Sequence, residues 1–262
     1  MIEPIESADD PRLDPFRHVA DPVWIRDRDL FVAEGRLVVE RLITLRRFDL
    51  QSILVNRAAC SALRETLSAV QAPVLVCDDP TLQTITGYHF HRGCLALAAR
   101  PAPLTPDALF DCRRVLAVES VGNPDNVGGL FRTAAALGVD GVLLNRTSGD
   151  PLYRKAIRTS MGAVLRVPFA RAHDWRGALA QFRGQGFQIL ALTPSPGAIG
   201  LAAVPVPRVD DRIMVMVGAE GPGLEATSLA DADIRVRIPI DGEIDSLNVV
   251  VAAGIALERL RG

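Results

Sequence analysis

Six apolar segments in the second half of the chain constrain its fold more than any other feature. Each has the length of a β-strand, and helical or loop segments separate one from the next. Strands that are apolar along their whole length are typical of a parallel sheet covered by helices on both faces. We therefore predict an α/β fold whose ligands bind at the carboxyl ends of the strands. The segments are VLAVES (115–120), GVLLN (141–145), VLRVPF (164–169), FQILAL (187–192), IMVMVGAE (213–220) and IRVRIPI (234–240).

The first hundred residues predict a second, smaller α/β unit. Helical and strand-like segments alternate there as far as residue 100, and the three prolines of PAPLTPD (101–107) predict a linker after it. We divide the chain into a flexible tail (1–20), a small domain (21–100), a linker (101–112) and a larger domain (113–262).

Composition and the N-terminus exclude several classes of protein. The chain is 48% hydrophobic and 23% charged, which is typical of a folded globular protein. No apolar run reaches the ~20 residues of a membrane span, and the acidic N-terminus does not resemble a secretory signal. We therefore expect a cytoplasmic protein with no membrane partner. The four cysteines have no CxxC spacing and predict reduced thiols, and no metal is expected.

Positive charge is concentrated in one stretch of a chain whose net charge is only −2. Between Asp150 and Asp174 there are several cations and no acidic residue, and a local patch of this kind can attract phosphates. The alternative is a solvated helix face. We select Arg154, Lys155 and Arg158 as candidate RNA-binding residues.

The first polar constellation is VESVGNPDNVGGLFRTAAALG (118–138). A polar turn follows a strand, and we expect a helix to begin around Asn126, which is a good N-cap. Arg132 is the only charge in VGGLFRTAAALG, and a partly buried arginine is costly unless it is paired. The structural alternative is an ion pair with Glu119 or Glu220. The GxGxxG spacing of a dinucleotide-binding fingerprint is absent.

The second constellation is MVMVGAEGPGLE (214–225), in which an apolar strand runs into a turn with three glycines. Glycines allow the backbone to approach a ligand closely. Glu220 would repel a phosphate, and no P-loop lysine follows. This turn therefore suits a ligand that carries positive charge.

The third constellation, RIPIDGEIDSLNVVVAAGIALERL (237–260), closes the chain. We expect Ser246 to cap a final helix, which its Ala-Ala-Gly-Ile-Ala stretch and its LERL ending favour over a strand. Capping does not explain Asn248, whose amide lies in an apolar run and needs a hydrogen-bond partner.

The three constellations together resemble the SpoU (TrmH-type) branch of the SPOUT RNA methyltransferases. NVGGLFRTA is similar to the asparagine-glycine-arginine motif of that family, GAEGPGL to its glycine-glutamate-glycine loop, and IPIDGEIDSLNVVVAA to its terminal motif. SMGA (160–163) resembles a further element of the family. Several members of the family have asparagine at the position of Ala219. This difference bears on the subgroup of the family to which the chain belongs rather than on its activity. In the first half, DLFVAEGRLVVERLI and GCLALAAR resemble a small L30e-like substrate-binding domain.

The resemblance implies a SPOUT domain with a C-terminal trefoil knot, and a homodimer whose active site takes residues from both subunits. It implies S-adenosylmethionine as the cofactor and methylation of an RNA ribose 2′-hydroxyl as the reaction. The L30e-like domain favours ribosomal RNA as the partner, with transfer RNA second.

The resemblance also implies roles for individual residues. Arg132 would orient the 2′-oxygen and stabilise the developing alkoxide, because a guanidinium does not normally deprotonate in proteins. The implied catalytic residues are Asn126, Arg132, Glu220, Ser246 and Asn248. The implied cofactor-binding residues are Leu192, Thr193, Gly218, Ile238 and Leu247.

Two other functions are compatible with parts of this pattern. One is a non-catalytic RNA- or ribosome-binding protein on a methyltransferase scaffold, against which the joint presence of all five catalytic residues argues. The other is an oxidoreductase on a doubly wound sheet, against which the missing GxGxxG argues.

Overall fold

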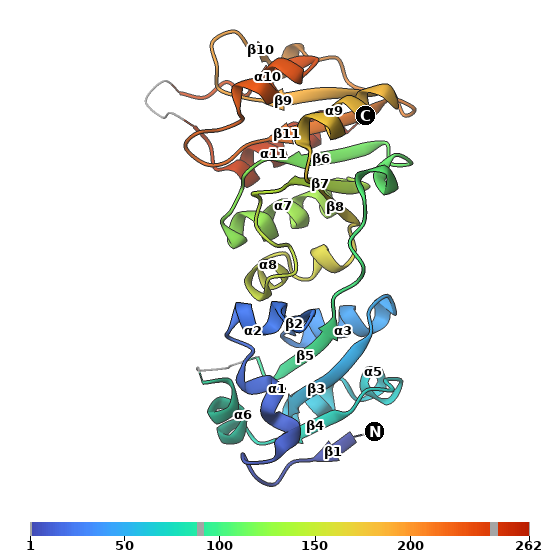
Figure 1. Cartoon of the computed structure of the whole chain (residues 1–262), viewed down its shortest axis with the longest axis vertical. Helices are drawn as coiled ribbons and strands as arrows, with labels where there is room; N and C mark the ends of the chain where they lie inside the picture. Colours follow the sequence, from blue (N-terminus) through green and yellow to red (C-terminus); the bar gives the residue numbers. More distant parts are fainter. Residues whose placement is uncertain (1, 88–91, 242–245, 262) are drawn as a thin grey trace. The chain divides into compact units, whose positions relative to one another are not determined.

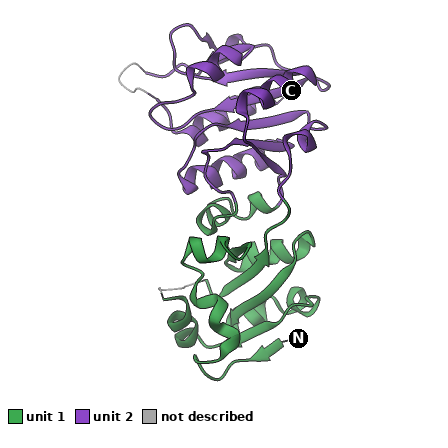
Figure 2. Cartoon of the chain, in the orientation of Figure 1, with its two compact units in different colours: residues 1–102, 152–165 green, residues 103–151, 166–262 purple. Residues whose placement is uncertain are grey.

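A computed structural model describes residues 2–87, 92–241 and 246–261, and the chain forms two compact units (Figure 2). The first unit contains residues 1–102 and 152–165, and the second contains residues 103–151 and 166–262. The segment 152–165, which the sequence assigns to the larger domain, therefore belongs to the first unit.

The first unit is built on a mixed five-stranded sheet with the order β1-β4-β3-β5-β2 (Figure 1). β5 is antiparallel to both of its neighbours, and the other pairs are parallel. After β3 the chain forms two short helices that meet at Leu63. The strands are β1 (Ile2–Pro4), β2 (Leu30–Glu34), β3 (Leu50–Asn56), β4 (Val74–Cys77) and β5 (Cys94–Ala99). The helices are α1 (Asp14–Arg17), α2 (Pro22–Arg26), α3 (Arg36–Leu45), α4 (Arg57–Ala62), α5 (Arg64–Ser68), α6 (Asp79–Thr86) and α8 (Arg154–Thr159).

The prediction of a flexible tail over residues 1–20 was wrong. β1 adds a parallel strand beside β4, and Leu13, Phe16 and Val19 are buried in the core of the first unit. These three apolar side chains are spaced three residues apart, so one face of a short helical segment presents all of them to the core. Burial of this face offsets the entropy lost by ordering the segment.

The second unit is built on a seven-stranded sheet with the order β10-β12-β9-β11-β6-β7-β8, and every pair in it is parallel (Figure 1). Alternating residues are buried on both faces, as Met214 and Val215 of β11 show. The predicted α/β fold with a parallel sheet is confirmed. The strands are β6 (Arg114–Val118), β7 (Gly141–Asn145), β8 (Phe169–Ala172), β9 (Phe187–Leu192), β10 (Ile199–Gly200), β11 (Arg212–Val217) and β12 (Ile234–Arg237). The helices are α7 (Pro124–Ala136), α9 (Trp175–Gly184), α10 (Ala226–Asp231) and α11 (Val249–Arg259).

Two segments differ from their predicted structure. In VLRVPF, residues 163–165 form a 3-10 helix, and the strand begins only at Phe169, after Pro168. The second half of the predicted linker also forms a 3-10 helix, Pro106–Leu109, whose Leu109 is buried in the core of the second unit. Residues 242–245 of the terminal motif lie outside the described residues, and the trefoil knot stays a prediction.

The four cysteines are free thiols, as predicted. Burial raises the pKa of Cys94 to about 12 and is the main cause that raises the pKa of Cys77 and of Cys112 to about 11. These three thiols are therefore protonated at neutral pH. Within the described part of the chain, no helix combines the length and the apolar character needed to cross a bilayer.

Candidate active site

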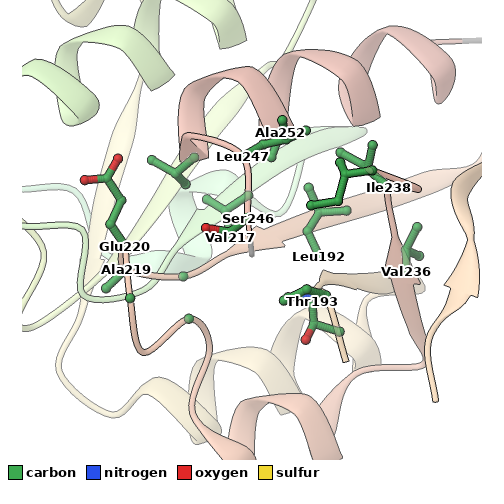
Figure 3. Close-up of a pocket in the computed structure, with 16 residues that line it drawn as sticks. Leu192, Thr193, Val217, Ala219, Glu220, Val236, Ile238, Ser246, Leu247 and Ala252 are labelled. Carbon is green, nitrogen blue, oxygen red and sulfur yellow. The ribbon is translucent and has the colours of Figure 1, made fainter. Parts of the chain in front are cut away.

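The loops that follow three neighbouring strands of the second unit line one pocket (Figure 3). β12, β9 and β11 are adjacent and parallel, so their carboxyl ends meet at one edge of the sheet. The start of α11 lines the same pocket. Its lining residues are Leu192, Thr193, Pro194, Val217, Gly218, Ala219, Glu220, Gly221, Gly223, Val236, Ile238, Ile240, Ser246, Leu247, Val249 and Ala252.

All five residues predicted to bind the cofactor line this pocket, and Glu220 and Ser246 of the predicted catalytic set line it too. Leu192, Ile238 and Leu247 provide apolar surface, and Figure 3 shows Glu220 at one end of the pocket and Ile238 at the other. The pocket therefore has an apolar wall that can cover a flat ring and a carboxylate that can attract a positive charge. This distribution fits S-adenosylmethionine, which carries an adenine ring and a sulfonium cation.

The glycine turn after β11 is folded tightly back on itself. A Cβ on Gly218 would lie 2.2 Å from the backbone carbon of Gly223, so only glycine is accommodated there. The backbone N–H of Gly223 donates a hydrogen bond to the carbonyl of Ala219 at 3.0 Å. The close approach explains why an apolar strand runs directly into glycine at this position.

Asn248 connects the three sequence constellations. Its Nδ2 donates to Oδ1 of Asn126 at 3.1 Å and to Oε1 of Glu220 at 2.8 Å. Its Oδ1 accepts a hydrogen bond from the backbone N–H of Val250 at 2.9 Å. The partners that this amide was predicted to need therefore come from the first constellation, the second constellation and its own helix.

Two predicted helix caps were wrong. α7 begins at Pro124 and its N-cap is Asn123, which accepts from the N–H of Asp125, because proline is favoured in the first turn of a helix. Asn126 instead lies inside the helix and is buried. The N-cap of α11 is Asn248 rather than Ser246, and Ser246 is an exposed residue that lines the pocket.

Arg132 lies on α7 and is exposed, not partly buried as predicted. It does not line the pocket, and within the described residues its guanidinium makes no hydrogen bond or ion pair. The expected helix geometry explains this placement, because six residues of helix put Arg132 about 9 Å along the axis and ~120° around it from Asn126. The structure therefore brings four predicted catalytic residues together and leaves the fifth apart.

Glu119 was considered in the sequence only as an ion-pair partner for Arg132, and the structure gives it different partners. Glu119 is 1% exposed, and its two carboxylate oxygens accept from Trp175 Nε1 at 2.9 Å and from the backbone N–H of Glu225 at 2.8 Å. Trp175 Nε1 also lies 3.1 Å from the hydroxyl of Ser228. This carboxylate therefore anchors the end of the glycine turn. Its strand-end position was the only signal in the sequence.

Comparisons with known proteins show the family to which the chain belongs. The sequence profile of the SpoU rRNA methylase family matches residues 113–258. The chain is 39% identical to an uncharacterized tRNA/rRNA methyltransferase of Mycobacterium tuberculosis, over 99% of this chain and 92% of that protein. The chain belongs to the SpoU family. The family is the TrmH-type branch of the S-adenosylmethionine-dependent RNA 2′-O-ribose methyltransferases, as the three constellations predicted.

Solved structures of similar fold cover nearly the whole chain. An S-adenosylmethionine-bound rRNA methyltransferase from Sinorhizobium meliloti has a TM-score of 0.82 at 24% identity and covers 99% of this chain, with 97% of its own chain covered. An RNA 2′-O-ribose methyltransferase has a TM-score of 0.77 at 25% identity, with coverage of 99% and 98%. The fold of both units is therefore shared with these proteins.

Proposed function

We propose that this chain methylates a ribose 2′-hydroxyl of ribosomal RNA, and that the five predicted catalytic residues (Asn126, Arg132, Glu220, Ser246 and Asn248) act in this reaction. The observation that carries the proposal is the amide of Asn248, which joins Asn126 and Glu220 beside a pocket suited to S-adenosylmethionine. When bound, this cofactor supplies a methyl group that its sulfonium already activates. The remaining task of the protein is to position the hydroxyl and to help it lose its proton.

Leu192, Thr193, Gly218, Ile238 and Leu247 are proposed to hold the cofactor. Thr193 is buried and its hydroxyl lies 2.8 Å from that of Ser195, while its backbone N–H donates to the carbonyl of Val236. The loop after β9 is thereby fixed beside the pocket. We infer that main-chain groups of this loop and of the glycine turn meet the polar edge of adenine.

Asn126, Ser246 and Asn248 are proposed to hold the ribose or its phosphate. Glu220 accepts a hydrogen bond from Asn248, and this fixes the direction in which the amide donates. Because Glu220 stands at the pocket and carries a negative charge, it also favours a cationic ligand over a phosphate at that end.

Arg132 is proposed to orient the 2′-oxygen and to stabilise negative charge on it, in the active site of a partner subunit. Its exposed position on α7, apart from the pocket of its own chain, supports this arrangement.

α11 has an exposed apolar face, on which Val251 is 50% exposed and Ile255, one helical turn further on, is 41% exposed. An apolar face of this kind suits a second copy of the chain, so the proposed enzyme is a homodimer.

We infer that ribosomal RNA is the substrate because the first unit matches the expectation of a small substrate-binding domain, and transfer RNA is the alternative. We infer that the enzyme acts in the cytoplasm, where both RNAs are found. The test compares maps of ribose methylation on the two RNAs from cells with and without the gene. Loss of one mark from ribosomal RNA is expected. Loss of a transfer RNA mark would contradict the choice of substrate, and an unchanged set of marks would contradict the activity.

Arg132→Ala tests the central role in vitro. We expect the folded variant to bind S-adenosylmethionine as the unmodified protein does and to lose methyl transfer by about 10²–10³, the usual effect of removing one group that stabilises an oxyanion. Methyl transfer is measured with the RNA that loses its mark in the cellular experiment, and calorimetry measures cofactor binding. A variant with nearly unchanged turnover would exclude this role for Arg132.

A further inference from the structure

A buried carboxylate in the first unit is surrounded by three arginines. Glu34, the last residue of β2, is 3% exposed, and its Oε2 lies 3.2 Å from Nη1 of Arg154. Its Oε1 lies 3.7 Å from Nε of Arg92 and 3.8 Å from Nη1 of Arg158. We call these residues the Glu34 cluster (Glu34, Arg92, Arg154 and Arg158). Among the described residues Glu34 is the acidic partner of both Arg92 and Arg158, so these two arginines give the cluster a surplus of positive charge.

The backbone around the Glu34 cluster is held in place. The N–H of Gly35 donates to the carbonyl of Cys94 at 2.8 Å, which continues the pairing of β2 with β5. Gly35 has a φ of 94°, and a Cβ there would lie 3.2 Å from Cδ of Arg92, so glycine permits the arginine to approach. On the α8 segment, the carbonyl of Met161 accepts a hydrogen bond from Arg41.

The three guanidinium groups reach solvent although their counter-ion does not. The side chains of Arg92, Arg158 and Arg154 are 49%, 35% and 21% exposed, while that of Glu34 is 4% exposed. At the opposite edge of the same sheet, negative charges outnumber positive ones, because the single cation Arg12 pairs with both Glu3 and Asp10. The surplus of positive charge is thus a property of the Glu34 cluster and not of arginines throughout this unit.

We propose that the Glu34 cluster binds backbone phosphates of the RNA substrate. This inference rests on the proposed function, which supplies the RNA. Arginine binds phosphate through two parallel hydrogen bonds, and a phosphate group would neutralise the positive charge of Arg92 and Arg158 that Glu34 alone does not balance. Glu34 holds the guanidinium groups in place before RNA arrives, which reduces the side-chain entropy lost on binding. The contact positions RNA and carries no sequence information.

The experiment measures binding of ribosomal RNA, purified from cells that lack the gene, to the full chain over a range of salt concentrations. Arg92→Gln and Arg158→Gln are compared with Arg12→Gln, which makes the same change of charge at a side chain of similar exposure, 45%. Each cluster variant is expected to bind RNA roughly three- to tenfold more weakly at low salt. The slope of log binding constant against log salt concentration, called the salt slope below, is expected to become shallower by about one. Arg12→Gln is expected to leave the slope unchanged.

An unchanged slope in both cluster variants, or an equal reduction in Arg12→Gln, would overturn the inference. Thermal melting tests whether each variant folds, and we expect the half-exposed Arg92 to be replaceable in a folded chain. Methyl transfer separates this inference from the proposed function, because the cluster variants should raise KM for RNA and leave both kcat and cofactor affinity unchanged. If the unmodified chain transfers no methyl group while the slopes change as expected, only the proposed function fails. If it methylates RNA with an unchanged KM in both variants, only the cluster fails.

Discussion

At the scale of single residues, the site depends on polar atoms that each have one acceptable orientation. Asn248 donates to two acceptors through its nitrogen and accepts through its oxygen, so rotation of the amide by 180° would place like groups against each other. Glu119 is constrained in the complementary way, because both of its oxygens face donors. A carboxylate can satisfy two donors at once, and an amide of the same shape cannot.

Glu119→Gln therefore tests whether this carboxylate positions the glycine turn. The amide must direct its NH₂ group at either Trp175 or the N–H of Glu225, and one unsatisfied buried donor costs about 1–3 kcal/mol. We expect weaker cofactor binding, measured by calorimetry as a higher Kd with kcat changed little. Adding Trp175→Phe removes the opposing indole N–H and should restore part of the affinity.

Glu225→Gln provides the matched control for this prediction. The side chain of Glu225 is exposed, and only its backbone N–H contacts Glu119, so the same chemical change should leave cofactor binding unaltered. Equal Kd values for Glu119→Gln and the unmodified chain would show that the turn does not depend on Glu119.

Residue roles could be predicted from the sequence only where position along a strand or a motif determines them. The family resemblance implied Leu192 and Gly218, and both line the pocket at the carboxyl ends of parallel strands, where ligands bind in such sheets. The caps could not be resolved in this way, since Asn123 and Asn126, or Ser246 and Asn248, are equally good capping residues. The pairing of Glu119 with Trp175 joins residues far apart in sequence, and no local pattern reports such a contact.

At the scale of elements, α7 and α11 are joined at both ends. At their N-terminal ends, Asn248 of the α11 cap contacts Asn126 of α7. At their C-terminal ends, Arg114 of β6 donates to the carbonyls of Leu137 and Leu257 at 2.7 and 2.8 Å. Burial lowers the pKa of Arg114, but an arginine remains charged at any pH that a folded protein tolerates. One cation thus satisfies carbonyls that two helix ends would otherwise leave unpaired.

Arg114→Met tests this connection between the helices. Loss of two hydrogen bonds from a charged donor, together with two unpaired carbonyls, is expected to lower the free energy of unfolding by about 2–4 kcal/mol. Denaturant unfolding measures the change. Arg113→Met is the control, because Arg113 is 56% exposed and should change stability by less than about 0.5 kcal/mol. Similar losses for both variants would contradict the role given to Arg114.

Elements in the second unit were easier to predict than those in the first. In the second unit, apolar strands that alternate with helices are enough to predict a parallel sheet. The strands that follow this pattern are β6, β7, β9, β11 and β12. The N-terminal segment was missed because β1 is only three residues long and the buried face of 11–19 is shorter than a helix pattern needs. Its order comes from packing against distant strands.

At the scale of the whole molecule, the proposed active site needs two copies of the chain. We predict that Arg132→Ala and Asn248→Ala, each inactive alone, recover activity when they are co-expressed or are unfolded and refolded together. A mixed dimer has one site in which both residues are intact, and random pairing then gives about one quarter of the activity of the unmodified protein.

A mixture of Arg132→Ala with Arg132→Lys or with another Arg132 variant cannot rebuild an intact site and serves as the control. Methyl transfer to RNA is the measurement in each case. If the Arg132→Ala and Asn248→Ala mixture forms mixed dimers and stays inactive, both residues must act within one chain.

The route of the chain has a consequence for any attempt to divide the molecule. The polypeptide leaves the first unit near residue 102, returns to it for residues 152–165, and then re-enters the second unit. A fragment that stops at residue 102 would keep Glu34 but lose Arg154 and Arg158, two of the cations that offset its burial. The first unit is therefore built from two separate stretches of the chain. A fragment cut at residue 102 would lack the second stretch and would be less stable than the intact unit.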